Sequence, residues 1–237
     1  MRSSSILLLL LFTTAGCTKV ESKSVLTSGI SALMSVTADG TGKSVASASL
    51  RVGDSSVDYV DLSSGDSLVA SSGTKSQPMS RSVLFNIVTY STEFAGLDAN
   101  GTAYTVAFKR SLDAGAPAST CTLPAPFTLT TPPPNSSFSR GGADITLTWQ
   151  GGTTDAMLYE LKGDCLTSKS ATLAGDPGTL QIPRGTVVVS DPKYAGQSCS
   201  GTLVVKRQRQ GKLDPAFGHG GSIFAEQVRV VTFTSTP

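Results

Sequence analysis

Apolar and polar residues alternate along two neighbouring segments of the chain, residues 30–36 and 46–52. A four-residue turn at 39–42 separates them and contains two glycines. A period of two places every apolar side chain of a segment on one face of a β-strand, and a glycine-containing turn lets the chain reverse. The two segments are therefore predicted to form a β-hairpin with one buried face. Its apolar positions are Ile30, Ala32, Met34, Val36, Ala46, Ala48, Leu50 and Val52.

More strands are predicted at short intervals in both halves of the chain, with turn residues such as Ser64-Gly65 between them. In the first half they span residues 57–62, 66–71, 82–94 and 102–110. In the second half they span residues 144–149, 156–163, 178–183, 185–190, 200–210 and 226–235. Six or seven short strands in about 85 residues are typical of an immunoglobulin-like sandwich. The fold class is predicted to be all-β, with two such sandwich domains in tandem.

A proline-rich segment separates the two sets of strands. Its six prolines are Pro117, Pro124, Pro126, Pro132, Pro133 and Pro134. Proline cannot donate to a sheet ladder and stiffens an extended chain, so this segment is either a semi-rigid joint or an edge strand. The predicted units are a signal peptide (1–16), a tether (17–25), a first sandwich (26–112), a proline-containing linker (113–125) and a second sandwich (126–237).

The second set of strands places its large apolar residues on single faces. Those of the strand at 144–149 are Ile145, Leu147 and Trp149, and those of the strand at 156–163 are Met157, Tyr159 and Leu161. A proline-containing first strand, a Trp that ends the second strand and a Tyr-x-Leu third strand together resemble a fibronectin type III or related immunoglobulin-like domain. This resemblance implies a fold and no function.

The composition supports the all-β prediction and excludes some partners. Ser, Thr, Gly and Val are abundant, 39% of residues are hydrophobic and 15% are charged. β-branched residues favour strands, while this hydrophobic content is enough for a folded core. The formal net charge is +2 at pH 7, so there is no electrostatic reason to expect a nucleic acid partner.

The amino terminus has the three parts of a secretory signal. Arg2 precedes the seven apolar residues at 6–12, and small residues follow up to Cys17. Seven apolar residues are too few for a transmembrane helix, which needs roughly 20. The segment is therefore predicted to direct export and then to be removed.

The stretch Thr14-Ala15-Gly16-Cys17 resembles the lipobox of bacterial lipoproteins. That resemblance implies that the Cys17 thiol is diacylglycerylated, that the signal is cut before it and that the new amino group is acylated. The alternative is an exported, unmodified thiol. Thr18 stands where such lipoproteins carry Asp when they are retained in the inner membrane, so the resemblance implies an outer-membrane location, in either leaflet.

Lipidation of Cys17 would leave Cys121, Cys165 and Cys199 for pairing in an oxidising compartment. In a fibronectin-like sheet the third and sixth strands are antiparallel neighbours, which implies a Cys165–Cys199 disulfide. Cys121 would then be a thiol that is either buried or available for intermolecular pairing. No C-x-x-C pair is present, and no metal site is predicted.

Candidate catalytic chemistry is sparse. His219 is the single histidine, it lies among glycines, and no G-x-S-x-G motif stands at a strand-to-helix turn. The acidic turns at 63–66 and 97–101 do not match a calcium-binding loop. We therefore predict no catalytic residues and no cofactor.

The densest basic stretch is residues 206–212. One interpretation is a strand end that leaves the core and enters a solvated hairpin. The other is a contact with an envelope polyanion such as lipopolysaccharide, made by Lys206, Arg207, Arg209 and Lys212.

As a whole, the chain is similar to a group of bacterial lipoproteins with tandem immunoglobulin-like or fibronectin type III-like β-sandwich domains. The lipobox and the stretches TLPAPFTLTTP, ITLTW and DPAFGHGGS carry this resemblance, which implies no activity. The predicted function is non-catalytic binding or adhesion by a lipoprotein held to the membrane through Cys17, with an envelope protein or glycan as partner. The alternatives are a structural spacer or assembly factor of the envelope and, third, a hydrolase.

Overall fold

The computed structural model describes residues 19–237 except 56 and 143, and the predicted signal peptide and Cys17 lie outside this part. The described residues form eighteen β-strands and three 3₁₀ turns, η1 (Ser22–Ser24), η2 (Thr27–Gly29) and η3 (Pro192–Tyr194). None of their helical segments has the length and apolar character needed to cross a membrane. The all-β prediction is confirmed.

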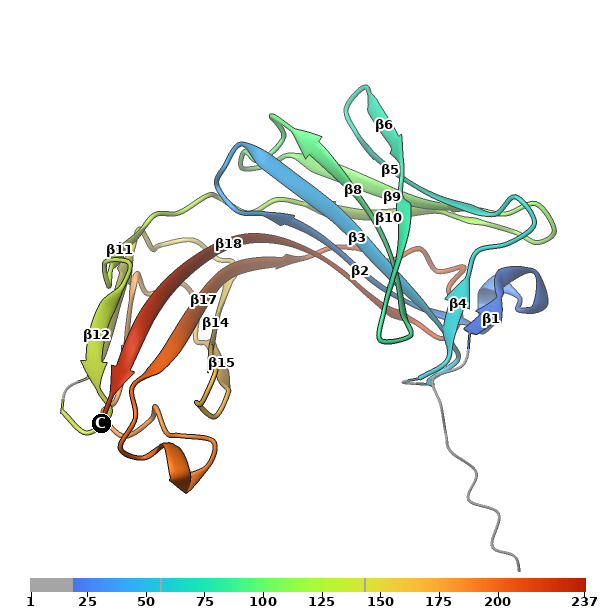
Figure 1. The fold of residues 1–237 in the computed structure, drawn as a ribbon. Helices are drawn as coiled ribbons and strands as arrows, with labels where there is room; N and C mark the ends of the chain where they lie inside the picture. The colour runs from blue at the N-terminus through green and yellow to red at the C-terminus, as the bar shows by residue number, and fades with distance from the viewer. Residues whose placement is uncertain (1–18, 56, 143) are drawn as a thin grey trace, which may run out of the picture.

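One sheet of eleven strands extends through the whole molecule (Figure 1). Its main path is β1 (Lys19–Glu21), β4 (Tyr59–Asp61), β3 (Lys43–Val52), β2 (Ile30–Ala38), β18 (Gly221–Thr236), β17 (Cys199–Gln210), β14 (Ala156–Gly163) and β15 (Lys169–Leu173). Three strands lie off this path: β8 (Ile87–Ala95) pairs with β3, β7 (Ser80–Leu84) pairs with β8, and β12 (Ser136–Ser139) pairs with β18.

Two smaller sheets complete the sandwiches. The four-stranded sheet has the order β10 (Ala116–Thr122), β9 (Ala103–Lys109), β5 (Ser67–Ser72) and β6 (Lys75–Pro78). The three-stranded sheet has the order β11 (Leu129–Thr131), β13 (Ile145–Trp149) and β16 (Thr179–Ile182).

Each small sheet packs against a different part of the large one and encloses its own hydrophobic core. In the first core, Ile30 and Leu50 of the large sheet pack with Leu68 and Phe108 of the four-stranded sheet. The second core joins side chains of β14, β17 and β18 to those of β13 and β16, and contains Leu147, Trp149, Met157, Leu161, Ile182, Leu203 and Phe233.

Strands β17 and β18 belong to both sandwiches. Residues 221–227 of β18 pair in parallel with β2, and residues 233–236 pair in parallel with β12, while β17 runs antiparallel along the strand from Phe224 to Ser235. Figure 1 shows the pair as one continuous curve from β11 and β12 at one end to β2 and β3 at the other. The predicted second unit, 126–237, therefore contributes to both cores, with Phe217, Ile223 and Ala225 in the first.

The expected tether and linker differ from what the structure contains. Residues 19–21 form β1, which pairs in parallel with β4, and the Arg110 side chain donates hydrogen bonds to the carbonyl oxygens of Ser22 and Val25 at 2.5 and 2.8 Å. Residues 116–122 form β10, at the edge of the four-stranded sheet. Of the two interpretations of the proline-rich segment, the edge strand is the one that applies there, because Pro117 lies on an edge where one side of the backbone needs no partner.

Two predicted strands differ as well. The expected strand at 82–94 is a hairpin of β7 and β8, because the backbone reverses at Phe85 and Asn86, whose φ angles are 48° and 65°. Residues 185–190 form no strand among the described residues, apart from one isolated bridge between Leu166 and Val189.

Candidate functional site

A groove of about 530 Å³ lies beside the middle of β18, between the two sandwiches. We call it the β18 groove. Its size is within the range of small-ligand sites. Its lining residues are Asp39, Gly40, Phe127, Thr128, Leu129, Thr130, Pro132, Pro133, Pro134, Val228, Arg229, Val230 and Val231.

The floor of the groove is an open stretch of sheet edge. Strand β2 pairs with β18 only as far as Gln227, and β12 begins its pairing at Phe233, so residues 228–232 of β18 have no strand on this side. The gap exists because β2 ends at the Asp39-Gly40 turn, while the three prolines at 132–134 precede β12 and cannot donate to a ladder.

The hydrogen-bond pattern shows which backbone groups face the gap. The Gly211 amide donates to the Ile223 carbonyl, so odd-numbered residues of β18 direct their polar groups toward β17. On the opposite edge, the Thr232 carbonyl accepts from the Asn135 amide at 2.8 Å. The N–H and C=O of Val230 therefore point into the groove, and among the described residues neither has a protein partner. The Val230 side chain is 58% exposed.

One wall of the groove is fixed by Arg229. Its Nε donates to the Phe127 carbonyl and its Nη1 to the Val228 carbonyl, each at 2.7 Å, and the guanidinium lies 5.1 Å from the centre of the Phe127 ring. Burial lowers the pKa of Arg229. Gly40 (φ +86°) allows this approach, because a Cβ there would lie 2.8 Å from the Arg229 Cζ.

Arg207 lies against Phe127 as well, and its guanidinium is 5.0 Å from the ring centre. The side chain is almost fully buried, pairs with Asp176 at 2.8 Å and donates to the carbonyl oxygens of Ala125 and Gln150. Arg207 and Arg229 thus hold the segment that connects the two sandwiches.

The interpretation of residues 206–212 as a polyanion contact is wrong for Arg207, which is buried. Arg209 makes two hydrogen bonds to Asp155 at 2.7 and 2.8 Å, while its side chain is partly exposed. The solvated-hairpin interpretation is wrong for Arg207 for the same reason: burial of a guanidinium requires a carboxylate partner, and Asp176 supplies it. Lys206 is partly exposed and lies 3.7 Å from Glu226, and Lys212 is exposed. A polyanion contact by Arg209 and these two lysines stays a prediction.

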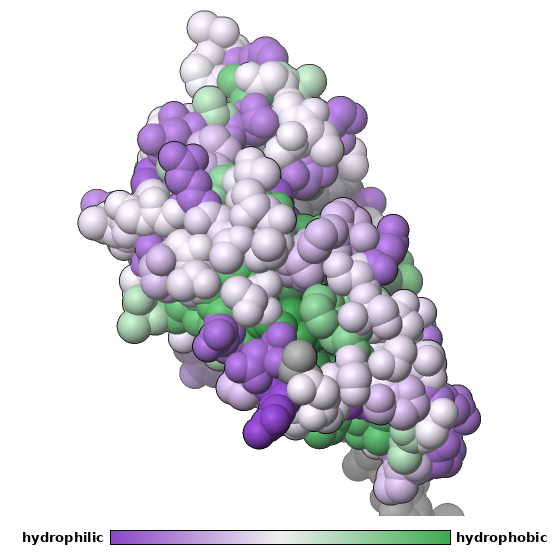
Figure 2. Space-filling model, turned by 90° about the vertical axis from the view of Figure 1, so that its left-hand side faces the viewer, coloured by the Kyte–Doolittle hydropathy of each residue, from purple (hydrophilic) through white to green (hydrophobic). Residues whose placement is uncertain are grey.

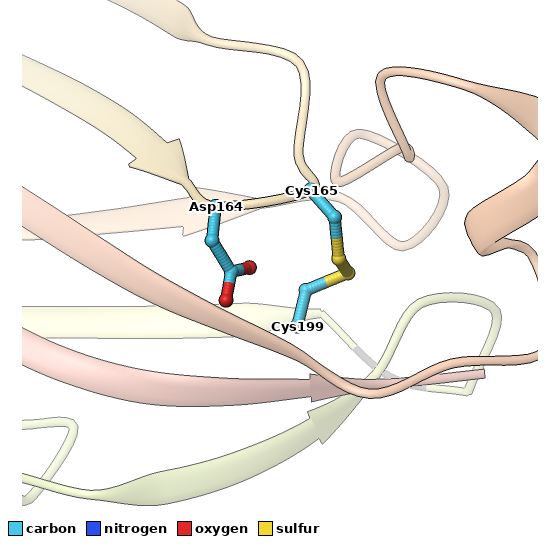
Figure 3. Close-up of side chains that lie close together, drawn as sticks. All are labelled: Asp164, Cys165 and Cys199. Carbon is cyan, nitrogen blue, oxygen red and sulfur yellow. A yellow bond between two sulfur atoms is a disulfide. The ribbon is translucent and has the colours of Figure 1, made fainter.

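The predicted disulfide is confirmed: Cys165 and Cys199 are bonded, with their Cα atoms 5.6 Å apart. Cys165 follows β14 and Cys199 begins β17, which are antiparallel neighbours (Figure 3). Asp164 lies beside them, and the three side chains together have the proximity of a metal site. Both sulfurs are used in the disulfide, so the thiolates that would hold a metal ion are not present.

The remaining described cysteine, Cys121, is buried in the first core. Burial raises the pKa of its thiol to about 12, so almost none of it is ionised at neutral pH. Of the two fates expected for Cys121, the structure contains the buried one.

His219 lies in the turn before β18, where its Nδ1 is 3.6 Å from a carboxylate oxygen of Asp54. The Asp54 side chain is 93% exposed. A histidine and carboxylate this open to water do not form the buried, oriented pair that general-base catalysis requires.

Figure 2 shows the end of the molecule that carries β11 and β12. Its surface is mostly polar or weakly polar, with a hydrophobic band between two polar regions. The exposed apolar residues of this sandwich include Val188 and Val230.

The β18 groove could not be found from sequence alone, because it depends on where β2 and β12 stop along β18. The Asp39-Gly40 turn and the proline triplet marked its two ends, but nothing in the sequence placed them beside the same strand.

No protein-family model matches the chain, and no curated protein matches its sequence. Among solved structures, the chain is similar to a titin fragment (titin A168–A169), with 12% identity, a TM-score of 0.26, and 86% of this chain and 96% of the other covered. It is similar to the tandem Ig repeats of Dlar, with 10% identity, a TM-score of 0.31, and coverage of 84% and 98%. It is also similar to the Ig1–Ig3 ectodomain of mouse nectin-like molecule 4, with 11% identity and a TM-score of 0.26. That match covers 87% of this chain and 64% of the other. Likenesses of this strength transfer no activity or partner to this chain.

Proposed function

We propose that the protein is an exported lipoprotein of the outer membrane, held through an acylated Cys17, that binds an extended segment of a partner polypeptide in the β18 groove. Its role is recognition or adhesion and involves no catalysis. The single observation that carries this proposal is the open edge at Val230.

An unpaired edge recognises a particular chemistry. A donor and an acceptor on one residue of an extended strand match the backbone of another extended chain, which is the basis of recognition by strand addition. The five residues from 228 to 232 span four steps, about 13 Å at 3.3 Å per step. The groove therefore suits a short extended segment whose backbone pairs with Val230.

The lipobox supports the anchored location. Each buried methylene contributes about 0.8 kcal/mol, so one acyl chain binds a membrane weakly, while two or three hold stably. Triacylated Cys17 would keep the groove at the envelope, where the partner is a protein with an exposed extended segment.

The groove is tested by photo-crosslinking in intact cells. The photoreactive residue p-benzoylphenylalanine replaces exposed Thr128, which lines the groove, in the parent chain and in Val230→Pro and Val230→Thr variants. Proline removes the Val230 donor, whereas threonine keeps both backbone groups and favours a strand. We expect one cross-linked polypeptide in the parent and in Val230→Thr, and its loss in Val230→Pro.

The control places the photoreactive residue at Val188, outside the groove. Unfolding transitions of all variants establish that they remain folded. The same cross-link at Val188, or its survival in Val230→Pro, would contradict strand addition. A complete absence of cross-links would favour the alternative of a structural spacer or assembly factor.

The anchor is tested separately by the intact mass of the protein from the membrane fraction. We expect a chain that begins at Cys17 and carries a diacylglyceryl group and an N-acyl group. Cys17→Ser should lose these groups and the processing. An unmodified chain in the membrane fraction would overturn the acylation.

A further inference from the structure

The turn between β7 and β8 exposes three large apolar side chains. Phe85 is 87% exposed, Leu84 is 65% exposed and Ile87 is 43% exposed. Together with Asn86 they make up residues 84–87, at the end of the hairpin. We call this apolar cluster the β7–β8 tip. An apolar cluster at a protruding turn is a common sign of an interaction site.

The backbone of the β7–β8 tip makes the aromatic residue unexpected. Both Phe85 and Asn86 have positive φ angles, 48° and 65°. Two-residue turns of this kind favour Asn-Gly or Asp-Gly, and a bulky residue at positive φ is an outlier with an energetic cost. Among the described residues, no aromatic ring or cation lies against Phe85 to offset that cost.

The pairing registers place the β7–β8 tip at the amino-terminal end of the fold. Strand β8 runs antiparallel to β3 with Tyr90 opposite Ala48, so Ile87 lies level with the last residues of β3. Arg51, near the same end of β3, pairs with Tyr59, which pairs with Lys19 of β1. Figure 1 shows β1, β4 and the turn between β7 and β8 at the same end of the molecule.

Cys17 must lie near this end of the fold, because it is only two residues before Lys19 in the chain. Two peptide units separate it from Lys19, so their Cα atoms are at most about 7.6 Å apart. A lipid on Cys17 would bring the membrane to the end of the fold where β1 begins and the β7–β8 tip projects.

We propose that the β7–β8 tip inserts into the interfacial region of the membrane that holds acylated Cys17. This inference rests on the proposed acylation. The lipid confines the fold to the surface, and burial of Phe85, Leu84 and Ile87 then adds a second contact that fixes its orientation.

The orientation has a consequence for the β18 groove. Residue Ile30 of β2 is at the membrane end, opposite Val52, while Ala38 is followed by the Asp39-Gly40 turn in the groove. Strand β2 has nine residues, a length of about 26 Å at 3.3 Å per step. Insertion of the tip would therefore hold the groove away from the membrane, open to a partner.

The test supplies the lipid chemically. A chain that begins at Cys17 keeps every described residue, and its Cys17 thiol is coupled to a maleimide phospholipid in phosphatidylethanolamine–phosphatidylglycerol vesicles. Cys121 is buried and Cys165 and Cys199 are bonded, so coupling is directed to Cys17. Phe85→Trp reports on the tip and Val188→Trp is the control at the other sandwich. Native Trp149 is buried and its emission is subtracted with the parent chain.

The readout is quenching of tryptophan emission by phospholipids brominated on their acyl chains. We expect the added emission of Phe85→Trp to shift to the blue and to be largely lost, while that of Val188→Trp is unchanged. Equal quenching in both variants, or none in Phe85→Trp, would overturn the insertion. Because the lipid is supplied by coupling, either result is independent of acylation in cells, which the intact-mass measurement decides.

Discussion

The guanidinium of Arg207 lies 2.8 Å from a carboxylate oxygen of Asp176, and neither side chain is exposed by more than 2%. Asp176 also accepts hydrogen bonds from Trp149 Nε1 and Thr153 Oγ1, each at 2.7 Å. The pair connects β17, which runs through both sandwiches, to the core of the second one. The positive charge of Arg207 is therefore paired inside the protein and is not available to a polyanion at the surface.

Asp176→Asn should strongly destabilise the protein. It leaves the Arg207 charge buried without a counter-ion, and removal of one partner of a buried pair costs about 3–5 kcal/mol of unfolding free energy. Urea denaturation, followed by the emission of Trp149, measures this loss. The matched control is Glu93→Gln, because Glu93 pairs with Lys43 at 2.8 Å where both side chains are about half exposed. Little change is expected there. Equal effects of the two substitutions would contradict a special role for the buried pair.

The same carboxylate predicts a loss of stability in acid. Burial raises the pKa of Asp176, but the hydrogen bonds from Trp149 and Thr153 and the charge of Arg207 outweigh it, so the net pKa lies below its usual 3.8. A carboxyl whose pKa is lowered on folding stabilises the fold above its unfolded pKa, and this stabilisation disappears as the pH falls through the folded pKa. The difference in unfolding free energy between the parent and Asp176→Asn should be constant near neutral pH and shrink in acid. A difference that stays constant down to the acid limit would contradict this linkage.

Loss of the disulfide should destabilise the second sandwich. Cys165 and Cys199 are 34 residues apart, and closing a loop of that length stabilises by about 4 kcal/mol in the chain-entropy model. The double substitution Cys165→Ala with Cys199→Ala should therefore lower the unfolding free energy by about 2–4 kcal/mol. Reduction of the parent should give a similar loss, with no further effect of reductant on the double variant. If reductant also lowered the unfolding free energy of the double variant, its effect on the parent could not be assigned to the Cys165–Cys199 disulfide.

The Cys121 thiol should be inert in the folded protein. It is 4% exposed and its pKa is raised to about 12, so both access and ionisation limit its reaction with a maleimide at pH 7. We expect labelling to follow the unfolding transition in urea. Rapid stoichiometric labelling of the native protein without denaturant would contradict the burial.

Local patterns predicted the parts of the fold that local physics determines. The hairpin of β2 and β3 and the strand at 156–163 follow from alternation, and the latter is observed with the same bounds. The disulfide followed from the neighbouring third and sixth strands implied by the resemblance. The two strands of the hairpin are joined by a glycine-containing turn, which the sequence shows directly. The two cysteines are brought together by a strand order that the fibronectin-like resemblance implies.

Long-range pairing was not predictable in the same way. Nothing in the alternation of residues 226–235 shows that one strand pairs in parallel with β2 and then with β12, since these partners lie far away in the sequence. Arg207 illustrates the same limit for a side chain. Arginine is almost never fully buried without a partner, and the partner Asp176 lies 31 residues earlier in the chain, in the loop between β15 and β16. The β18 groove depends on the long-range pairing, since its lining includes residues 228–231 of β18 but neither Arg207 nor Asp176.

Phe127→Leu should loosen the junction of the two sandwiches. The Phe127 ring lies about equally far from the guanidinium groups of Arg207 and Arg229, at 5.0 and 5.1 Å. Leucine keeps an apolar side chain but loses both cation–π contacts, each worth about 0.5–2 kcal/mol, so the unfolding free energy should fall by about 1–4 kcal/mol. Hydrogen exchange at residues 123–129 should rise in parallel.

Phe138→Leu is the matched control for this substitution. Phe138 packs edge-on against Phe233 at 5.9 Å, and within the described part of the chain its ring makes no cation–π contact, so its loss should cost about 0.5–1.5 kcal/mol. It should leave hydrogen exchange at 123–129 unchanged, because Phe138 lies on β12 rather than on the connecting segment. Hydrogen exchange at 123–129 that rose no more in Phe127→Leu than in Phe138→Leu would contradict a role for the cation–π contacts. The two arginines would then stabilise the segment only through their hydrogen bonds to its carbonyl oxygens. In that case Arg229→Lys is the substitution expected to raise hydrogen exchange at 123–129.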